Sequence, residues 1–226
     1  MAKSFQNISL ELMKKHLKLY FVMGSVNCLK HPVEVLSEAI EGGITIFQYR
    51  EKGKGALQGE EKLQLGKKLQ FLCKQNDIPF IVNDDINLAL ELDADGVHIG
   101  QEDGDISKIR KLVGTKMLGI STHNLSEATE AVKLGANYIG VGPMYETNTK
   151  LDTNEVAGPD MIRHLRQNNI KIPIVGIGGI NQNNLKLVIN AGADGVALIS
   201  AISSFNHPRE AASKLIETIN DAYTIE

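Results

Sequence analysis

The sequence predicts an α/β fold, a single (β/α)8 (TIM) barrel in which eight parallel strands alternate with helices. Eight short runs rich in β-branched and aromatic residues alternate with longer amphipathic stretches. The runs are almost continuously apolar, which is typical of parallel strands buried on both faces. A chain of 226 residues also has the usual length of one such barrel, so we expect a single domain, 1–226.

The elements follow one another in a regular order along the chain. Helices are predicted where apolar residues recur three and four apart, and several of these stretches end in Gly or Asp directly before a strand, as in a C-capping turn. A doubly wound Rossmann-type sheet is the competing fold, but no GxGxxG motif follows the first strand. The expected strands are 19–23, 44–49, 79–83, 96–100, 117–121, 138–142, 172–179 and 195–200, with helical stretches at 32–43, 61–77, 126–136 and 183–193.

Composition narrows the classes of partner. The balance of 24 Lys and Arg against 27 Asp and Glu gives a net charge of −3, which does not indicate nucleic-acid binding. The two cysteines, Cys28 and Cys73, lie far apart and indicate neither a disulfide framework nor a zinc site. No export signal is visible, and the longest N-terminal apolar run is far shorter than the roughly 20 residues that span a bilayer. We therefore expect a cytoplasmic protein without a membrane or nucleic-acid partner; a homo-oligomer is compatible with the sequence.

Nearly every unusual polar residue lies where an expected strand ends. In a barrel these ends share one face, and active sites form there. We therefore expect the following residues to converge: Gln48, Arg50, Glu51, Lys52, Asn83, Asp84, Asp85, Gln101, Glu102, Asp103, Ser121, Thr122, His123, Glu146, Thr147, Thr149, Lys150, Gly178, Gly179 and Ser200.

The motif GIGG, 176–179, predicts a phosphate site together with Ser200 after the eighth strand. Glycines allow backbone N–H groups to approach an anion, and the N-terminus of a following helix adds partial positive charge. The position after strands seven and eight is the usual phosphate site of a barrel. The alternative is a tight turn in which the glycines serve sterics alone.

Asp84 and Asp103 come from adjacent strand ends and predict a Mg²⁺ site. Mg²⁺ prefers a few carboxylates and completes its shell with water and substrate phosphates. Helix capping is the alternative for Asp84, because Asp is common at helix starts. Asp105 is a better cap candidate than Asp103, which leaves Asp103 available as a ligand.

Arg50, Lys52 and Lys150 form a basic set at the same strand ends. A guanidinium binds phosphate oxygens in a bidentate manner, and ammonium groups stabilise a leaving diphosphate. A solvated surface is the alternative for each of them taken singly. The polar segment 142–152 is longer than a minimal turn and is a candidate lid.

The histidines do not indicate a hydrolase. His98 lies within an expected strand, where a hydrogen-bonded core histidine is favoured over a catalyst, and His123 keeps a site role open. No carboxylate nearby in the sequence suggests a Ser-His-Asp triad, and no GxSxG motif is present.

These segments together carry a resemblance to a known family. The chain resembles the thiamine-phosphate synthase family, also called thiamine-phosphate pyrophosphorylase, over residues 47 to 202. No single segment is specific, but several long ones together are. They are FQYREKG (47–53), IVNDDINLAL (81–90), ADGVHIGQED (94–103), LGISTHN (118–124), YIGVGPMYETNTKLD (138–152), PIVGIGGI (173–180) and GVALISAI (195–202).

The resemblance implies a transferase that joins 4-amino-2-methyl-5-hydroxymethylpyrimidine diphosphate to 4-methyl-5-(2-phosphoethyl)thiazole, with Mg²⁺, giving thiamine phosphate and diphosphate. Diphosphate would leave first, and the thiazole nitrogen would then attack the carbocation. The implied catalytic residues are Arg50, Lys52, Ser121 and Lys150. The pyrimidine diphosphate would be bound by Gln48, Tyr49, Arg50, Glu51, Lys52, Asn83, Ser121 and Lys150, the thiazole phosphate by Thr147, Asn148, Thr149, Gly179, Ile199 and Ser200, and Mg²⁺ by Asp84 and Asp103.

Two other functions stay open at this stage. A thiazole tautomerase of the same superfamily would isomerise the thiazole phosphate, and Ser121 and His123 suit proton transfer. It would have no use for diphosphate or Mg²⁺ ligands, so the intact QYREK, ND and TNTK segments favour the synthase. A non-catalytic protein that binds the thiazole phosphate on the same barrel would bind its ligand without turnover.

Overall fold

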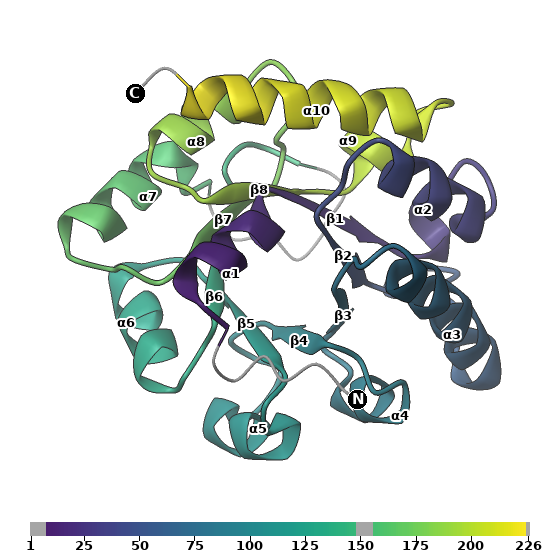
Figure 1. Cartoon of the computed structure of the whole chain (residues 1–226). Helices are drawn as coiled ribbons and strands as arrows, with labels where there is room; N and C mark the ends of the chain where they lie inside the picture. The colour runs from purple at the N-terminus through teal and green to yellow at the C-terminus, as the bar shows by residue number, and fades with distance from the viewer. Residues whose placement is uncertain (1–7, 148–155, 225–226) are drawn as a thin grey trace.

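A computed structural model describes residues 8–147 and 156–224 and contains one closed barrel of parallel strands, β1 to β8, in sequence order. Figure 1 shows the helices arranged around the outside of the barrel. The expected fold class is confirmed. The strands are β1 Leu19–Met23, β2 Ile46–Tyr49, β3 Phe80–Asn83, β4 Gly96–Ile99, β5 Met117–Thr122, β6 Tyr138–Val141, β7 Ile174–Ile177 and β8 Gly195–Leu198.

Most strands are shorter than their apolar runs suggest. The run 44–49 gives a strand only from Ile46, which pairs with Tyr20 of β1. The run 172–179 gives a strand that ends at Ile177, because Gly178 has a positive φ of 98° and turns the chain. Pairing partners and turn glycines therefore set the ends, which an apolar run alone does not reveal.

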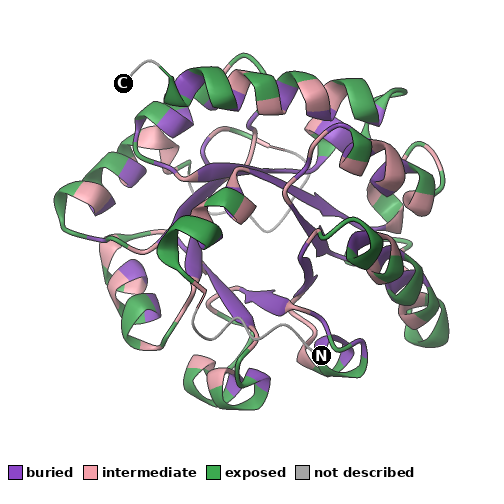
Figure 2. Ribbon diagram, viewed as in Figure 1, coloured by how far each residue is buried: buried purple, intermediate pink, exposed green. Residues whose placement is uncertain are grey.

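The helices cover the barrel from outside, and Figure 2 shows that their buried residues face the strands while the opposite sides are exposed. The four expected helical stretches correspond to α2, α3, α6 and α8. The helices are α1 Leu10–Leu17, α2 Pro32–Glu41, α3 Gly59–Gln75, α4 Ile86–Glu91, α5 Ile106–Val113, α6 Leu125–Lys133, α7 Gly158–Gln167, α8 Leu185–Asn190, α9 Ser200–Ser203 and α10 Pro208–Tyr223, with a 3-10 turn η1 at Ser25–Asn27.

The repeated helix endings are left-handed turns, as the sequence predicts. Gly43, Asp93, Gly135 and Gly192 follow α2, α4, α6 and α8 with φ values of 97°, 47°, 79° and 103°. A residue with positive φ just beyond a helix ends it and redirects the chain. In this fold the redirected chain enters the next strand directly.

Alternation along the strands separates two apolar layers. Residues facing the helices form the larger cluster, which includes Phe21 and Phe47. Residues facing the barrel axis form a second cluster, which includes Tyr20, Ile46 and Tyr138. The barrel interior is thus a packed layer with two tyrosines in it, and it supports the strand ends that carry the site.

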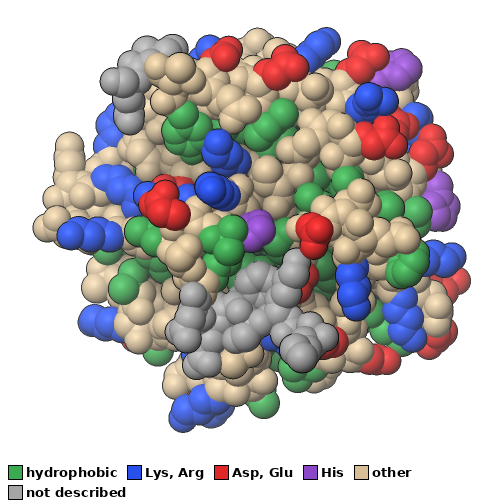
Figure 3. All heavy atoms as spheres, in the orientation of Figure 1, with side chains coloured by type: hydrophobic (Ala, Val, Ile, Leu, Met, Phe, Trp, Pro, Cys, Tyr) green, Lys and Arg blue, Asp and Glu red, His purple; other side chains and the backbone are tan. Residues whose placement is uncertain are grey.

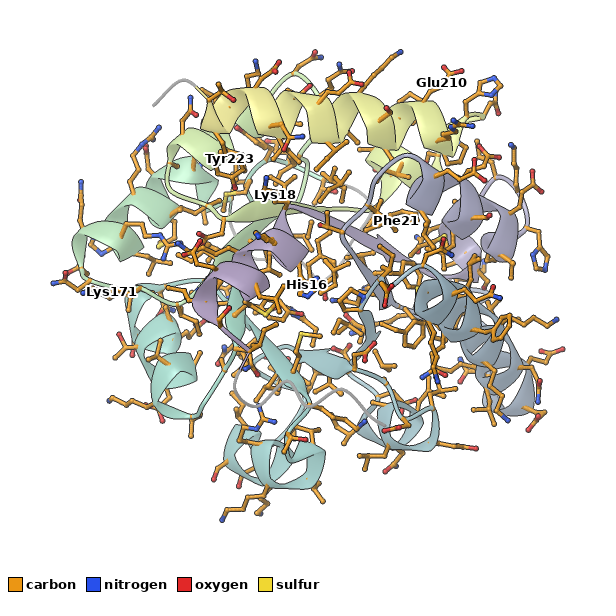
Figure 4. All side chains as sticks on the ribbon, in the orientation of Figure 1. His16, Lys18, Phe21, Lys171, Glu210 and Tyr223 are labelled. Atoms are coloured by element: carbon orange, nitrogen blue, oxygen red, sulfur yellow. The ribbon has the colours of Figure 1, made fainter. Side chains whose placement is uncertain are left out.

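Helix α1 lies across the N-terminal end of the barrel, which is the end nearest the viewer in Figure 1. Its Met13 and Leu17 belong to the interior cluster. The approach is close, since a Cβ added at Gly195 would lie 1.8 Å from the carbonyl oxygen of Leu17. Just beyond α1, Lys18 Nζ lies 5.3 Å from the ring centroid of Tyr223 on α10, and Figure 4 shows the two side by side.

Thr122, at the end of β5, offers a stability prediction. Among the described residues its Oγ1 is the buried side-chain oxygen that has no hydrogen-bond partner, and its side chain is 1% exposed. Thr122→Val keeps the shape and removes the unpaired hydroxyl, so we expect the free energy of unfolding to rise by about 1 kcal/mol. Chemical denaturation checks this, and a lower stability of the valine variant would contradict it. Thr129→Val is the control, because its hydroxyl donates to Leu125 O at 2.7 Å.

Two further observations concern the apolar length of the helices and the distribution of charge on the surface. Within residues 8–147 and 156–224, no helix is both long enough and apolar enough to cross a membrane. Acidic and basic side chains are interspersed over the face drawn in Figure 3, so that neither sign dominates that face.

Candidate active site at the C-terminal ends of the strands

The loop after β6 packs directly on the loop after β7. The backbone N–H groups of Met144 and Tyr145 donate to the carbonyl oxygens of Ile177 and Gly178 at 2.9 and 3.0 Å. Gly179 has a φ of 65°, and a Cβ there would lie 2.5 Å from Glu146 O. The glycines therefore have a steric purpose, which is to let these two loops approach and bring residue 147 to the mouth of the barrel.

A cavity of about 360 Å³ opens at this point, within the size range of small-molecule sites. It brings together four residues of the predicted thiazole-phosphate set: Thr147, Gly179, Ile199 and Ser200. Asn148, Thr149 and Lys150 of the predicted sets lie outside the described residues. The full lining is Glu146, Thr147, Ile177, Gly178, Gly179, Ile180, Asn181, Ala197, Leu198, Ile199, Ser200, Ala201 and Phe205.

The helix expected at 183–193 begins at Leu185, so a short turn separates it from the glycines. In this turn Asn181 N donates to Asn184 Oδ1 at 2.8 Å. After β7 the rim of the cavity is therefore made by the backbone of the turn, while after β8 it is made by the first residues of α9, Ser200 and Ala201. An anion there would depend on backbone N–H groups exposed beside the glycines.

Two carboxylates, from Asp84 after β3 and Asp103 after β4, lie next to each other. Burial raises the pKa of Asp84, and the neighbouring Asp103 carboxyl raises it further, while Lys52 opposes the rise. Lys52 Nζ lies 3.2 Å from Asp84 Oδ2, and Gly100 N donates to Asp103 Oδ2 at 2.6 Å. Two like charges held together in this way favour a cation between them.

Helix capping does not account for either carboxylate. Asp85, not Asp84, caps α4 by accepting from Leu88 N at 3.0 Å, and Asp105 caps α5 by accepting from Lys108 N at 3.2 Å. Asp84 instead has a φ of 59°, a conformation that only a few non-glycine residues adopt. The other non-glycine residues with positive φ in the described ranges, Asp77, Asp93 and Asn169, each follow a helix, whereas Asp84 directly follows strand β3.

The donor set fits Mg²⁺ rather than a tightly caged metal. Within residues 8–147 and 156–224 no group of three or more His, Cys, Asp or Glu residues could hold a metal ion. Two carboxylates supply only part of a shell, and Mg²⁺ is the common protein cation that leaves the remainder to water and phosphate oxygens. Asp84 and Asp103 are the residues that would hold it.

The end of β2 presents side chains on opposite sides of the barrel wall. Arg50 is only 6% exposed, so its guanidinium is held within the protein at the strand end. Tyr49 points outward to α3, where its Oη donates to Lys62 O at 3.0 Å. The side chain of Tyr49 is therefore not among the groups gathered at the mouth, although its backbone leads to them.

Glu51 connects two loops of the mouth. Its carboxylate accepts from Ser25 N at 2.8 Å, from the Ser25 hydroxyl, and from Leu57 N at 2.9 Å. These bonds tie the turn after β1 to the loop after β2. In this arrangement Glu51 acts on its neighbours Arg50 and Lys52 by fixing their backbone, because its own oxygens are engaged within the protein.

A row of hydrogen bonds crosses the interior of the barrel below the mouth. Gln48 Nε2 donates to Tyr20 Oη at 2.7 Å, and Tyr20 Oη lies 2.7 Å from Tyr138 Oη. Tyr138 Oη lies 3.2 Å from His98 Nδ1, and His98 Nε2 lies 3.0 Å from Ser121 Oγ. The row links two predicted pyrimidine-binding residues, Gln48 and Ser121, from opposite sides of the barrel.

The sequence does not reveal the tyrosines of this row, because each lies in an apolar run typical of a core strand. One signal was available: Tyr20 and Tyr138 occupy inward positions of their strands, and an interior tyrosine needs a hydrogen-bond partner. His98 agrees with the expectation of a hydrogen-bonded core histidine, since both ring nitrogens have partners.

His123 has a carboxylate partner that the sequence did not indicate. Its Nδ1 lies 2.9 Å from Glu127 Oε2, one helical turn away, and Glu127 also accepts from His123 N. The expectation itself was that no carboxylate supports a Ser-His-Asp triad. The pair still forms no triad with Ser121, whose hydroxyl is bonded to His98 instead.

Comparison with known proteins gives concordant results. A family model described as thiamine monophosphate synthase matches residues 19–202. The chain is 55% identical over 213 residues to a thiamine-phosphate synthase of Bacillus cereus (strain 03BB102), which covers 94% of this chain and 97% of the relative. It is 53% identical over 215 residues to one from Geobacillus thermodenitrificans (strain NG80-2), covering 95% and 97%.

A solved structure with the same architecture is also similar. It is a thiamine phosphate pyrophosphorylase from Pyrococcus furiosus, which is 36% identical to this chain and superimposes with a TM-score of 0.84. The match covers 93% of this chain and 98% of that one. The likeness therefore extends over the whole barrel and is not confined to the strand ends.

Proposed function

The chain belongs to the thiamine-phosphate synthase family and is a transferase, and from this premise we propose that it joins 4-amino-2-methyl-5-hydroxymethylpyrimidine diphosphate to 4-methyl-5-(2-phosphoethyl)thiazole. The products are thiamine phosphate and diphosphate. The observation that carries the proposal is the presence of two different regions at one barrel mouth, one suited to a phosphate and one suited to a cation that a diphosphate would bind. One is the cavity beside Gly179 and Ser200, and the other is the cluster of Asp84, Asp103 and Lys52.

The second region suits a diphosphate that leaves. Arg50 and Lys52 supply positive charge, and we assign the same role to Lys150, which lies outside the described residues. Asp84 and Asp103 would hold Mg²⁺, which would supply positive charge to the diphosphate. These charges stabilise the leaving group more as its bond to the methylene carbon breaks, so they lower the barrier rather than merely tighten binding.

The bond changes require no general base. The methylene carbon loses its bond to the diphosphate oxygen with both electrons, and the electron-rich aminopyrimidine stabilises the carbocation. The thiazole nitrogen then donates its lone pair to that carbon and becomes a cationic thiazolium. Gln48 and Ser121 hold the pyrimidine, and the cavity lined by Thr147 and Gly179 holds the thiazole phosphate. No proton is transferred, which agrees with the absence of a triad at Ser121.

The test is product formation by the purified chain given both substrates, with Mg²⁺ and with a chelator. We expect thiamine phosphate and diphosphate in equal amounts, only with Mg²⁺. Thiazole phosphate that is isomerised without the pyrimidine substrate would identify a tautomerase instead. Binding of the thiazole phosphate without any turnover would identify a non-catalytic binding protein, and either result would overturn the proposal.

Gly179→Ala tests the thiazole-phosphate region. The new Cβ would lie 2.5 Å from Glu146 O at a φ of 65°, so the two loops must separate. We expect KM for the thiazole phosphate to rise at least about tenfold, while KM for the pyrimidine diphosphate changes little. Gly114→Ala is the matched control, because Gly114 has a φ of 56° with open space around it. Equal KM values in the two alanine variants would contradict the assignment.

We also place the reaction in the cytoplasm. Cys28 and Cys73 are free thiols, as expected in a reducing compartment. Burial raises the pKa of both thiols, so neither is activated as a nucleophile.

A further inference from the structure

The row Gln48–Tyr20–Tyr138–His98–Ser121 is a continuous chain of hydrogen bonds with no role in the bond changes described above. It is buried from Gln48 to His98 and half-buried at Ser121. Its members come from β2, β1, β6, β4 and β5, and so it spans the barrel from one wall to the other. Tyr138 is 0% exposed, Tyr20 1%, Gln48 4% and His98 8%. Polar groups in a barrel interior cost stability unless they are satisfied, so a row of this length calls for an explanation.

The backbone around the row leaves space for its rings. A Cβ at Gly119 would lie 2.4 Å from His98 Nδ1 and 2.2 Å from Tyr138 Cζ. A Cβ at Gly140 would lie 3.1 Å from His98 Cε1. Both glycines lie inside strands, where glycine weakens a sheet. The absence of a side chain at Gly119 and Gly140 therefore allows His98 and Tyr138 to approach each other closely.

The direction of the hydrogen bonds follows from counting protons. Each tyrosine hydroxyl has a single proton to donate. Because Gln48 Nε2 donates to Tyr20 Oη, the Tyr20 proton goes to Tyr138, and the Tyr138 proton goes to His98 Nδ1. His98 then carries its own proton on Nε2 and donates it to Ser121 Oγ. The reverse direction would leave the Tyr20 proton without an acceptor in the row.

Both tyrosines keep the protons that this direction requires. Burial raises the pKa of Tyr20 and that of Tyr138, and for Tyr138 the neighbouring Tyr20 raises it further. Each hydroxyl therefore keeps its proton more firmly than an exposed tyrosine does. The two rings also pack edge to face, with centroids 5.9 Å apart, which limits their reorientation.

We propose that Tyr20, Tyr138 and His98 are positioning residues, which polarise the row so that Ser121 presents a hydroxyl donor and Gln48 a carbonyl acceptor to the substrate. Ser121 Oγ accepts from His98, which leaves its own proton for a ligand. Gln48 uses its amide nitrogen on Tyr20, which leaves Oε1 as an acceptor. One donor and one acceptor match the ring nitrogen and amino group of an aminopyrimidine; this last step rests on the proposed function.

The first test reads the His98 tautomer in the protein without substrate. Proteins labelled with ¹⁵N-histidine are compared by NMR, with His98→Gln used to assign the signal. We expect the Nε2–H tautomer in the wild type and in Tyr20→Phe, which leaves Tyr138, His98 and Ser121 intact. We expect the His98 ring signals to shift in Tyr138→Phe, which removes the donor to Nδ1. An Nδ1–H tautomer in the wild type would overturn the proposal, whether or not the chain makes thiamine phosphate.

The second test separates positioning from a purely structural role. In Tyr138→Phe we expect KM for the pyrimidine diphosphate to rise about tenfold, and KM for the thiazole phosphate to stay the same. Tyr223→Phe, which removes a hydroxyl bonded to Ala193 O far from the mouth, is the control. A fall in melting temperature with both KM values unchanged would show that the row only stabilises the barrel. If the wild type makes no product, the proposed function fails and the tautomer alone decides the direction of the row.

Discussion

Asp84→Asn is expected to reduce kcat by at least about a hundredfold and to raise the Mg²⁺ concentration needed for half-maximal turnover. The substitution keeps the size of the side chain but removes one of the two carboxylates that lie together after β3 and β4. It also removes the partner of Lys52, whose Nζ is 3.2 Å from Asp84 Oδ2. Steady-state kinetics at several Mg²⁺ concentrations measure both effects.

The neighbouring residue provides the control for this prediction. Asp85→Asn is the same chemical change one position later, where the carboxylate accepts from Leu88 N and pairs with Lys62 at 2.7 Å. We expect the control to lose about 1 kcal/mol of stability or less and to keep its Mg²⁺ dependence, because asparagine still caps a helix. A normal Mg²⁺ response in Asp84→Asn would refute the cation site.

Arg50→Ala carries the second large effect. The guanidinium is 6% exposed at the end of β2, and in the proposed reaction its removal would take preorganised charge from the leaving diphosphate. We expect a loss of about 3 kcal/mol of transition-state stabilisation, which is about a hundredfold in kcat at saturating substrate. Lys150→Ala should lose activity on the same scale. Arg50→Lys should recover only part of the rate, because an ammonium cannot bind phosphate in a bidentate manner.

Folding and catalysis must be separated for a buried arginine. Circular dichroism and thermal unfolding of Arg50→Ala show whether the barrel persists, since truncation of a buried side chain also leaves a cavity. Arg163→Ala on α7 is the surface control, because Arg163 pairs with Asp160 on the same helix. Turnover at the wild-type rate in both Arg50→Ala and Lys150→Ala would exclude them as leaving-group ligands.

The fold was predictable because its signal is repeated. Eight apolar runs alternate with amphipathic stretches, several of which end in a Gly or Asp turn before the next run, and this repetition leaves little choice of architecture. The turns at Gly43 and Gly135 have the left-handed backbone conformation of such a turn. Helix α1 was not predicted, because LELMKKHL is short and strongly charged. Its apolar side is buried by packing across the barrel end, which is a tertiary contact that local periodicity does not encode.

Those site residues were predictable whose position at the end of a strand is enough to place them at the barrel mouth. Thr147, Gly179 and Ser200 follow different strands, and barrel topology alone brings such residues together around one cavity. The interior row depends instead on which side of a strand each residue faces and on pairing register. Gly119 and Tyr138 are paired across β5 and β6, a fact that appears only once the strands are aligned. Asp84 and Asp85 likewise differ in backbone conformation, which the sequence does not reveal: Asp84 has a positive φ, and Asp85 caps α4.

Helix α1 closes one end of the barrel and leaves the opening at the other end. Met13 and Leu17 seal the end where the strands begin, and the interior layer above them is filled by side chains. Whatever binds at the other end must therefore depart through the same opening by which it arrived. The route in and the route out therefore cross the same strand ends that carry the candidate site.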